Sequence, residues 1–121
     1  MKKGVLKEKS FKFAVRIVNL YKYLCEEKKD YIMSKQILRS GTSVGAMIRE
    51  SEYSESIADF IHKLAIAQKE INETIYWLEL LTETDYISIK EFDSINADAV
   101  EIIKMITSSI KTSKSTLITN H

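Results

Sequence analysis

Two glycines lie four residues apart in the stretch RSGTSVGA, Arg39 to Ala46, and glycine-rich stretches can cradle phosphates. A phosphate-binding P-loop needs a preceding strand and a closing Gly-Lys-Ser/Thr, but no lysine follows Gly45 and no strand is predicted before the stretch. Gly41 and Gly45 instead fall inside a helical repeat of apolar residues. Because glycine has no side chain, such a pair lets a neighbouring backbone approach closely. We therefore interpret Gly41 and Gly45 as a helix-packing stripe.

The other reactive residues do not form a catalytic or metal-binding set. A di-metal centre in a helical bundle needs Glu-x-x-His from two helices, whereas this chain offers Asp59-x-x-His62 and Glu70-x-x-Glu73. Cys25 is the single cysteine, and it falls on an apolar helical face, where a thiol is usually inert packing. We predict no catalytic residue, no metal and no cofactor, and we do not expect an enzyme.

Four charged residues lie near the apolar repeat. Arg39 and Glu50 bracket the glycine pair, and Glu70 and Glu73 lie one helical turn apart further along the chain. Charged groups beside an apolar seam must be paired if they are buried. We interpret the four as a structural arginine–carboxylate network that fixes helix register, with a ligand site as the alternative.

The charges divide unevenly along the chain. Residues 1–49 carry twelve bases and four acids, whereas the remainder carries six bases and thirteen acids. Such asymmetry fits either a nucleic-acid-binding face or two complementary halves that attract each other. The nucleic-acid interpretation assigns phosphate contacts and base stacking to five residues of the first helix: Lys9, Lys12, Arg16, Lys22 and Tyr23.

The chain has 121 residues, of which 45% are hydrophobic, with three glycines and no proline, and this composition predicts a single all-α domain. Apolar residues recur by threes and fours over four segments. They predict helices at about residues 10–29, 34–53, 56–84 and 88–112, followed by a frayed tail over 113–121. Ser10, Ser56 and Ser88 are the expected N-caps. Short connections favour an up-down-up-down antiparallel four-helix bundle.

The first and third predicted helices carry more apolar surface than one bundle covers, which predicts homo-oligomerisation. The basic start of the chain lacks the apolar run of a signal peptide, and no segment approaches the length of a membrane span. We expect a cytoplasmic protein that does not contact a membrane.

Residues 36–81 carry the pattern of a known family. With these residues and the first-helix run FKFAVRIVNLYKYL, the chain resembles the bacterial four helix bundle protein family over about residues 10–110. That family includes the proteins encoded in intervening sequences of 23S rRNA genes, and the accessory variability determinant of diversity-generating retroelements is a relative. The chain departs from the family at Met47, where asparagine is usual, and at Ser51, where alanine is usual. The matching positions are Gln36, Leu38, Arg39, Ser40, Ser43, Gly45, Ala46, Glu50, Asp59, Phe60, Ala67, Glu70, Glu73, Tyr76, Trp77 and Leu78.

The resemblance implies a four-helix protomer that assembles into a ring-like homo-oligomer, typically a pentamer, with a non-catalytic role. The retroelement relative acts as a basic ring that partners a reverse transcriptase and RNA, so the resemblance implies RNA or DNA and a reverse transcriptase as partners. Our leading hypothesis is a homo-oligomeric scaffold that binds structured RNA through its first helix. The alternative is a protein–protein interaction module without nucleic-acid binding.

Overall fold

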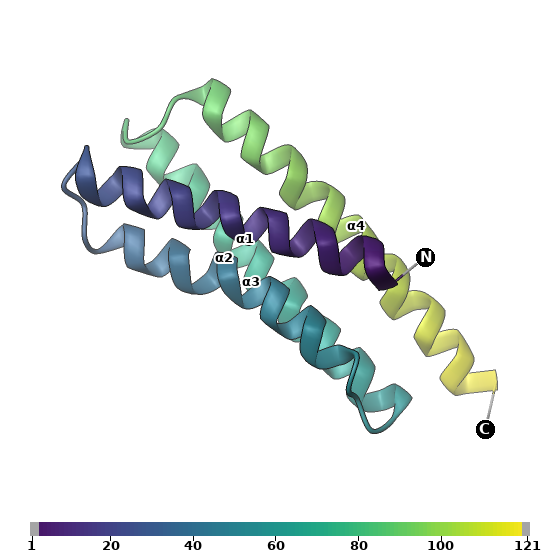
Figure 1. The fold of residues 1–121 in the computed structure, drawn as a ribbon. Helices are drawn as coiled ribbons and strands as arrows, with labels where there is room; N and C mark the ends of the chain where they lie inside the picture. The colour runs from purple at the N-terminus through teal and green to yellow at the C-terminus, as the bar shows by residue number, and fades with distance from the viewer. Residues whose placement is uncertain (1–2, 120–121) are drawn as a thin grey trace.

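Four α-helices make up the computed structural model, which describes residues 3–119. They are α1 (Lys3–Glu26), α2 (Met33–Ser51), α3 (Ile57–Glu83) and α4 (Ile89–Thr119), and no strand occurs in the described range. Successive helices run in opposite directions (Figure 1). Each helix packs against two others, so that α1 and α3 occupy opposite corners of the bundle, as do α2 and α4. The all-α, four-helix prediction is confirmed.

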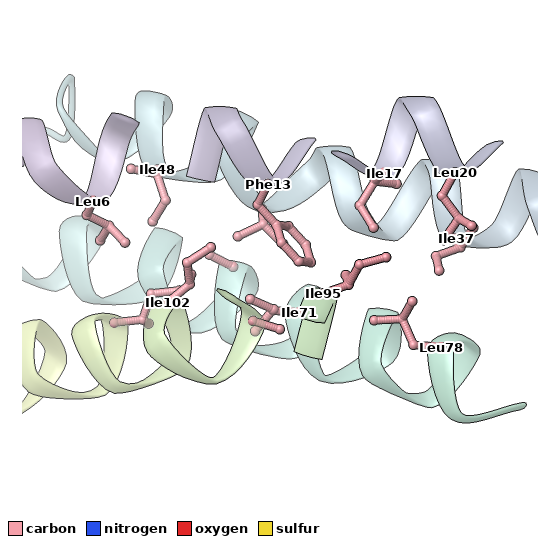
Figure 2. Packing of buried hydrophobic residues seen from close by; sticks show 14 of the residues in the cluster. Leu6, Phe13, Ile17, Leu20, Ile37, Ile48, Ile71, Leu78, Ile95 and Ile102 are labelled. Atoms are coloured by element: carbon pink, nitrogen blue, oxygen red, sulfur yellow. The ribbon is translucent and has the colours of Figure 1, made fainter. Parts of the chain in front are cut away.

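The core is built from the apolar repeats that the sequence contains. Figure 2 shows Phe13 and Ile17 of α1 directed toward the same interior as Ile71 of α3 and Ile102 of α4. Residues spaced by three and four share one face of a helix, so each seam enters the core as a unit. The buried seams are Phe13, Ile17, Leu20 and Leu24 on α1, Leu64, Ala67, Ile71, Leu78 and Leu81 on α3, and Ile95, Ala99, Ile102 and Ile106 on α4.

The first helix begins at Lys3. The prediction that Ser10 starts it was wrong, because Ser10 is buried inside the helix and its hydroxyl donates to the carbonyl of Lys7 at 3.1 Å. Continuing the helix N-terminally brings Leu6 into the core, where it is 4% exposed. The free energy gained by burying Leu6 offsets the conformational entropy lost in ordering the additional helical residues. No proline or glycine cap stops the helix at a later residue.

The last helix also exceeds its prediction. The segment predicted to fray from residue 113 is helical through Thr119, while residues 120–121 lie outside the described range. Its hydroxyl side chains bond back to the preceding turn, with Thr116 donating to the Thr112 carbonyl at 3.1 Å and Thr119 to the Ser115 carbonyl at 2.8 Å. These local bonds leave the helical backbone intact, so loss of apolar periodicity does not end the helix.

Two predicted caps are present. The Ser56 hydroxyl accepts a hydrogen bond from the Asp59 amide at 3.0 Å at the start of α3. Before α4, Ser88 and Glu91 form the reciprocal capping box, each side chain accepting from the other residue's backbone amide at 3.1 Å. Each cap satisfies backbone amides at the start of its helix that have no partner within the helix.

Candidate functional site

The basic residues of α1 meet the acidic residues of α4 along one edge of the bundle. The Lys9 ammonium lies 2.6 Å from Glu101, and the Glu101 carboxylate raises the pKa of Lys9 above its ordinary value. Arg16 donates to Asp98 at 2.8 Å. Arg16 also donates to the hydroxyl of Ser94 at 2.9 Å and to its carbonyl at 3.2 Å. Two of the predicted phosphate-binding residues therefore hold α1 against α4.

The remaining three candidates on α1 make none of these contacts, although Lys12 lines the same pocket as Lys9, Asp98 and Glu101. Lys12 pairs with Glu8 on its own helix at 2.9 Å and keeps 74% of its side chain exposed, and the pair lowers the pKa of Glu8. Lys22 is exposed and forms no ion pair with any residue in the described range. At 100° per residue, Lys22 lies about 120° around the helix from Arg16. Tyr23 is 36% exposed. The five residues do not form one continuous basic face.

Charge attraction between the two parts of the chain accounts for most of the ion pairs in residues 3–119. Besides Lys9–Glu101 and Arg16–Asp98, pairs join Lys7 to Glu52 and Arg39 to two glutamates, and all of these link a base in residues 1–49 to an acid beyond them. The observed pairing matches the interpretation of the uneven charge as two complementary halves.

Arg39 of α2 is bound between two carboxylates of α3. Its guanidinium donates to Glu70 at 3.0 Å and to Glu73 at 2.5 Å, and the Trp77 indole N–H donates to the same Glu73 oxygen at 3.1 Å. Hydrogen bonds from Arg39 and then Trp77 hold the pKa of Glu73 below its ordinary value. These bonds join α2 to α3. We call Arg39, Glu70, Glu73 and Trp77 the Arg39 cluster.

Glu50 does not belong to the Arg39 cluster, contrary to the prediction. It is exposed, and eleven residues of one helix separate it from Arg39 by about 16 Å along the axis, beyond the reach of the two side chains. The facing helix supplies closer carboxylates. Met47 and Ser51, the two departures from the family pattern, lie against or within the core rather than in the cluster.

Beneath the Arg39 cluster lies a buried polar contact that the sequence analysis did not identify. The hydroxyls of Ser40 on α2 and Thr74 on α3 are 2.9 Å apart, and both residues are fully buried. Thr74 also lies 2.8 Å from the Glu70 carbonyl. The sequence offered one signal for this contact: Thr74 occupies a core position in an otherwise aliphatic repeat of α3. A buried hydroxyl requires a hydrogen-bond partner, so a polar residue on a facing helix could have been expected.

The two glycines of the packing stripe face α1. A Cβ on Gly41 would lie 2.7 Å from both γ-carbons of Ile17, and a Cβ on Gly45 would lie 3.3 Å from the carbonyl oxygen of Ser10. Both distances are too short for an unadjusted side chain. The two glycines therefore let α1 and α2 approach each other closely, and α1, rather than a phosphate, lies against them.

One cavity of about 240 Å³ opens at the end of the bundle where α1 begins. Its floor contains Leu6, Ile48 and Leu64, and its rim contains hydroxyl groups of α4. Glu52 is the ionisable residue in its lining, and it pairs with Lys7 at 3.6 Å. Within the described residues, no group of three or more His, Cys, Asp or Glu side chains is placed to hold a metal. In the same range, no helix combines the length and apolarity of a membrane span.

Comparison with known proteins gives a consistent result. Residues 2–108 match the model of a family described as 23S rRNA-intervening sequence protein. The fold is similar to the crystal structure of a protein of unknown function from the S23 ribosomal protein family of Bacteroides thetaiotaomicron. The two are 62% identical with a TM-score of 0.90, over 92% of this chain and 99% of that chain. No curated protein matches the chain.

Proposed function

The chain belongs to the 23S rRNA-intervening sequence protein family, and from this premise we propose that it acts as a non-catalytic scaffold that assembles with copies of itself. The observation that carries the proposal is apolar surface that remains outside the core. Phe11 and Val15 of α1 are 54% and 46% exposed, and Tyr76 of α3 is 55% exposed. Phe11 and Val15 adjoin each other four residues apart on α1, and adjoining exposed apolar side chains typically mark a protein–protein contact.

The polar groups of the bundle support a structural role. The Arg39 guanidinium is occupied by two carboxylates, and the Ser40 hydroxyl is bonded to Thr74. His62 is exposed on α3, and Cys25 is half-buried beside the Ser34 hydroxyl at 3.6 Å. These nucleophiles and bases do not converge on a shared cavity, which is the arrangement that covalent catalysis would require.

Light scattering during size-exclusion chromatography tests the scaffold proposal. We expect a particle several times heavier than the 14.0 kDa chain that persists on dilution. A monomeric mass at every concentration would contradict the proposal. The same method with added polyanion also shows whether assembly depends on a ligand.

Nucleic-acid binding is a second candidate function, supported by the exposure of the α1 bases and by the family's link to rRNA genes. Lys9 and Arg16 retain 40% and 38% of their side-chain exposure despite their ion pairs. A phosphate backbone would have to share these bases with Glu101 and Asp98, which weakens each contact. Repetition of the same edge around an oligomer would compensate by avidity. Structured RNA is the target that we propose for this edge.

Binding of nuclease-treated protein to a fluorescent RNA helix across a salt series tests this candidate. Phosphate contacts predict an affinity that falls linearly with salt on a double-logarithmic plot. Lys12→Glu is the informative variant because Lys12 is exposed, whereas Arg16 ties α1 to α4 and its loss would also weaken the fold. Lys104→Glu on α4 makes the same charge change at another exposed lysine and serves as the control. Equal affinity of the Lys12→Glu variant and wild type would contradict the assignment.

A further inference from the structure

The buried face of α4 changes from aliphatic to hydroxyl side chains toward the end of the helix. Its apolar residues follow one another at steps of four, three and four: Ile95, Ala99, Ile102 and Ile106. The same spacing continues to Ser109 and Ser113, which are both half-buried. Because serine is much smaller than isoleucine, α4 fills less of the interior at this end of the bundle. The cavity of about 240 Å³ described above lies here, and both serines line it.

The floor of the cavity is apolar and is built by three helices. Leu6 of α1, Ile48 of α2 and Leu64 of α3 line it, and all three are buried. Figure 2 shows Leu6 and Ile48 at the same end of the core. Phe60 of α3 adds an aromatic ring to the lining. Such a floor favours the apolar body of a ligand, because contact with it removes that body from water.

The polar part of the lining consists mainly of hydroxyl groups. Ser51 of α2 contributes one, which already donates to the carbonyl of Ile48 at 2.6 Å. On α4, the hydroxyl of Ser113 forms no hydrogen bond with any other residue in the described range 3–119. A serine hydroxyl can both donate and accept a hydrogen bond. Ser113 can therefore bind a polar head group on a molecule whose body lies on the apolar floor.

The charges around the cavity favour an uncharged ligand. Among the described residues that line it, Glu52 is the ionisable one and none is basic. The Glu52 carboxylate lies 3.6 Å from the ammonium group of Lys7. An anionic ligand would meet Glu52 with no base in the lining, and a cationic ligand would have to compete with Lys7.

We propose that this cavity binds one small uncharged amphiphile, whose apolar body lies on the floor of Leu6, Ile48 and Leu64 and whose hydroxyl or amide head bonds to Ser113. An apolar cavity of about 150 Å³ holds benzene, so one of about 240 Å³ holds a body of roughly two fused rings. The site does not depend on self-assembly, and it would add a bound small molecule to the scaffold proposed above.

Equilibrium dialysis of the wild-type chain against three probes tests the ligand class. The probes 2-naphthol, naphthalene and 2-naphthoate share one apolar body and differ in the head group, and their ultraviolet absorbance measures the bound amount. We expect 2-naphthol to bind at one molecule per chain. The anion 2-naphthoate should bind at least about tenfold more weakly, because its carboxylate meets Glu52.

Substitutions of Ser113 test the location of the site. Ser113→Ile fills the cavity and should abolish binding of 2-naphthol and of naphthalene. Urea denaturation of this variant should give a stability equal to or above wild type, since isoleucine continues the aliphatic face of α4. Ser115→Ile makes the same change at an exposed position about 160° around the helix, and it should bind both probes like wild type.

Ser113→Ala tests the head group separately from the body. This variant keeps the space but removes the hydroxyl, so 2-naphthol should lose about three- to tenfold in affinity while naphthalene binds as before. Equal effects on the two probes would overturn the assignment of Ser113 to the head group.

Four other outcomes would overturn the proposal. They are absence of bound 2-naphthol up to its solubility limit, undiminished binding to Ser113→Ile, equal affinity for 2-naphthoate and 2-naphthol, and a fall in particle mass when 2-naphthol is added. The last result, seen by light scattering, would assign the cavity to a second copy of the chain. A wild-type chain that is monomeric yet binds 2-naphthol would leave this site intact and overturn only the scaffold.

Discussion

Gly41 of α2 lies so close to Ile17 of α1 that a Cβ on Gly41 would come within 2.7 Å of both γ-carbons of the isoleucine. Ile17 is completely buried and cannot move away without displacing the core. The contact explains why a helix-destabilising residue occupies the middle of α2. The close approach of two helices compensates for the roughly 1 kcal/mol of helix propensity that glycine costs.

Replacing Gly41 with alanine should destabilise the bundle. Overpacking against Ile17 costs about 1–3 kcal/mol, and improved helix propensity returns about 1 kcal/mol of it. Urea denaturation measures the change in unfolding free energy. Gly4→Ala is the matched control, since a Cβ there meets nothing within 4 Å, and it should leave stability unchanged or raised. If Gly41→Ala proved as stable as Gly4→Ala, the packing role of Gly41 would be wrong.

Replacing Thr74 with valine should cost about 1–3 kcal/mol of unfolding free energy, because it leaves the buried Ser40 hydroxyl without its 2.9 Å partner. The double variant Ser40→Ala with Thr74→Val should lose less than the two single losses added together, since it removes both polar groups. Denaturation of wild type, the two single variants and the double variant gives the four unfolding free energies of this double-mutant cycle. Additive losses would show that the two hydroxyls do not depend on each other.

Lowering the pH should break the ion pair between Arg39 and Glu73. The pKa of Glu73 is held below 4.5 by Arg39 and Trp77, so the stabilisation is fully present above the ordinary carboxyl pKa and is lost as pH falls through the lower, folded value. Because Arg39 and Glu73 are 50% and 36% exposed, the loss should stay below about 1 kcal/mol.

Trp77 is the only tryptophan, so its fluorescence reports the protonation of Glu73. The emission should change with a midpoint below 4.5 while the helical content stays constant. A Glu73→Gln variant should lose this transition. A transition that persists in the variant would assign it to another group.

The sequence was informative where a pattern repeats along one helix. The seams through Phe13 and Leu24, or Ile95 and Ile106, could be predicted because spacing alone places such residues on one face. The capping box at Ser88 could be predicted because its two members are three residues apart. Both kinds of signal are local.

The sequence was least informative where partners lie far apart along the chain. The ion pairs of Lys9 with Glu101 and of Arg16 with Asp98 could not be predicted, because the order of helices around the bundle decides this pairing. Glu50 seemed a partner for Arg39, but α3 presents nearer carboxylates. Side-chain pairing between helices depends on register, which the spacing within either helix does not specify.

Sedimentation velocity of the wild-type chain over a wide range of concentration tests the central claim of self-assembly most directly. The account predicts one species several times heavier than the 14.0 kDa chain at every concentration. A species of 14.0 kDa at every concentration would contradict the account.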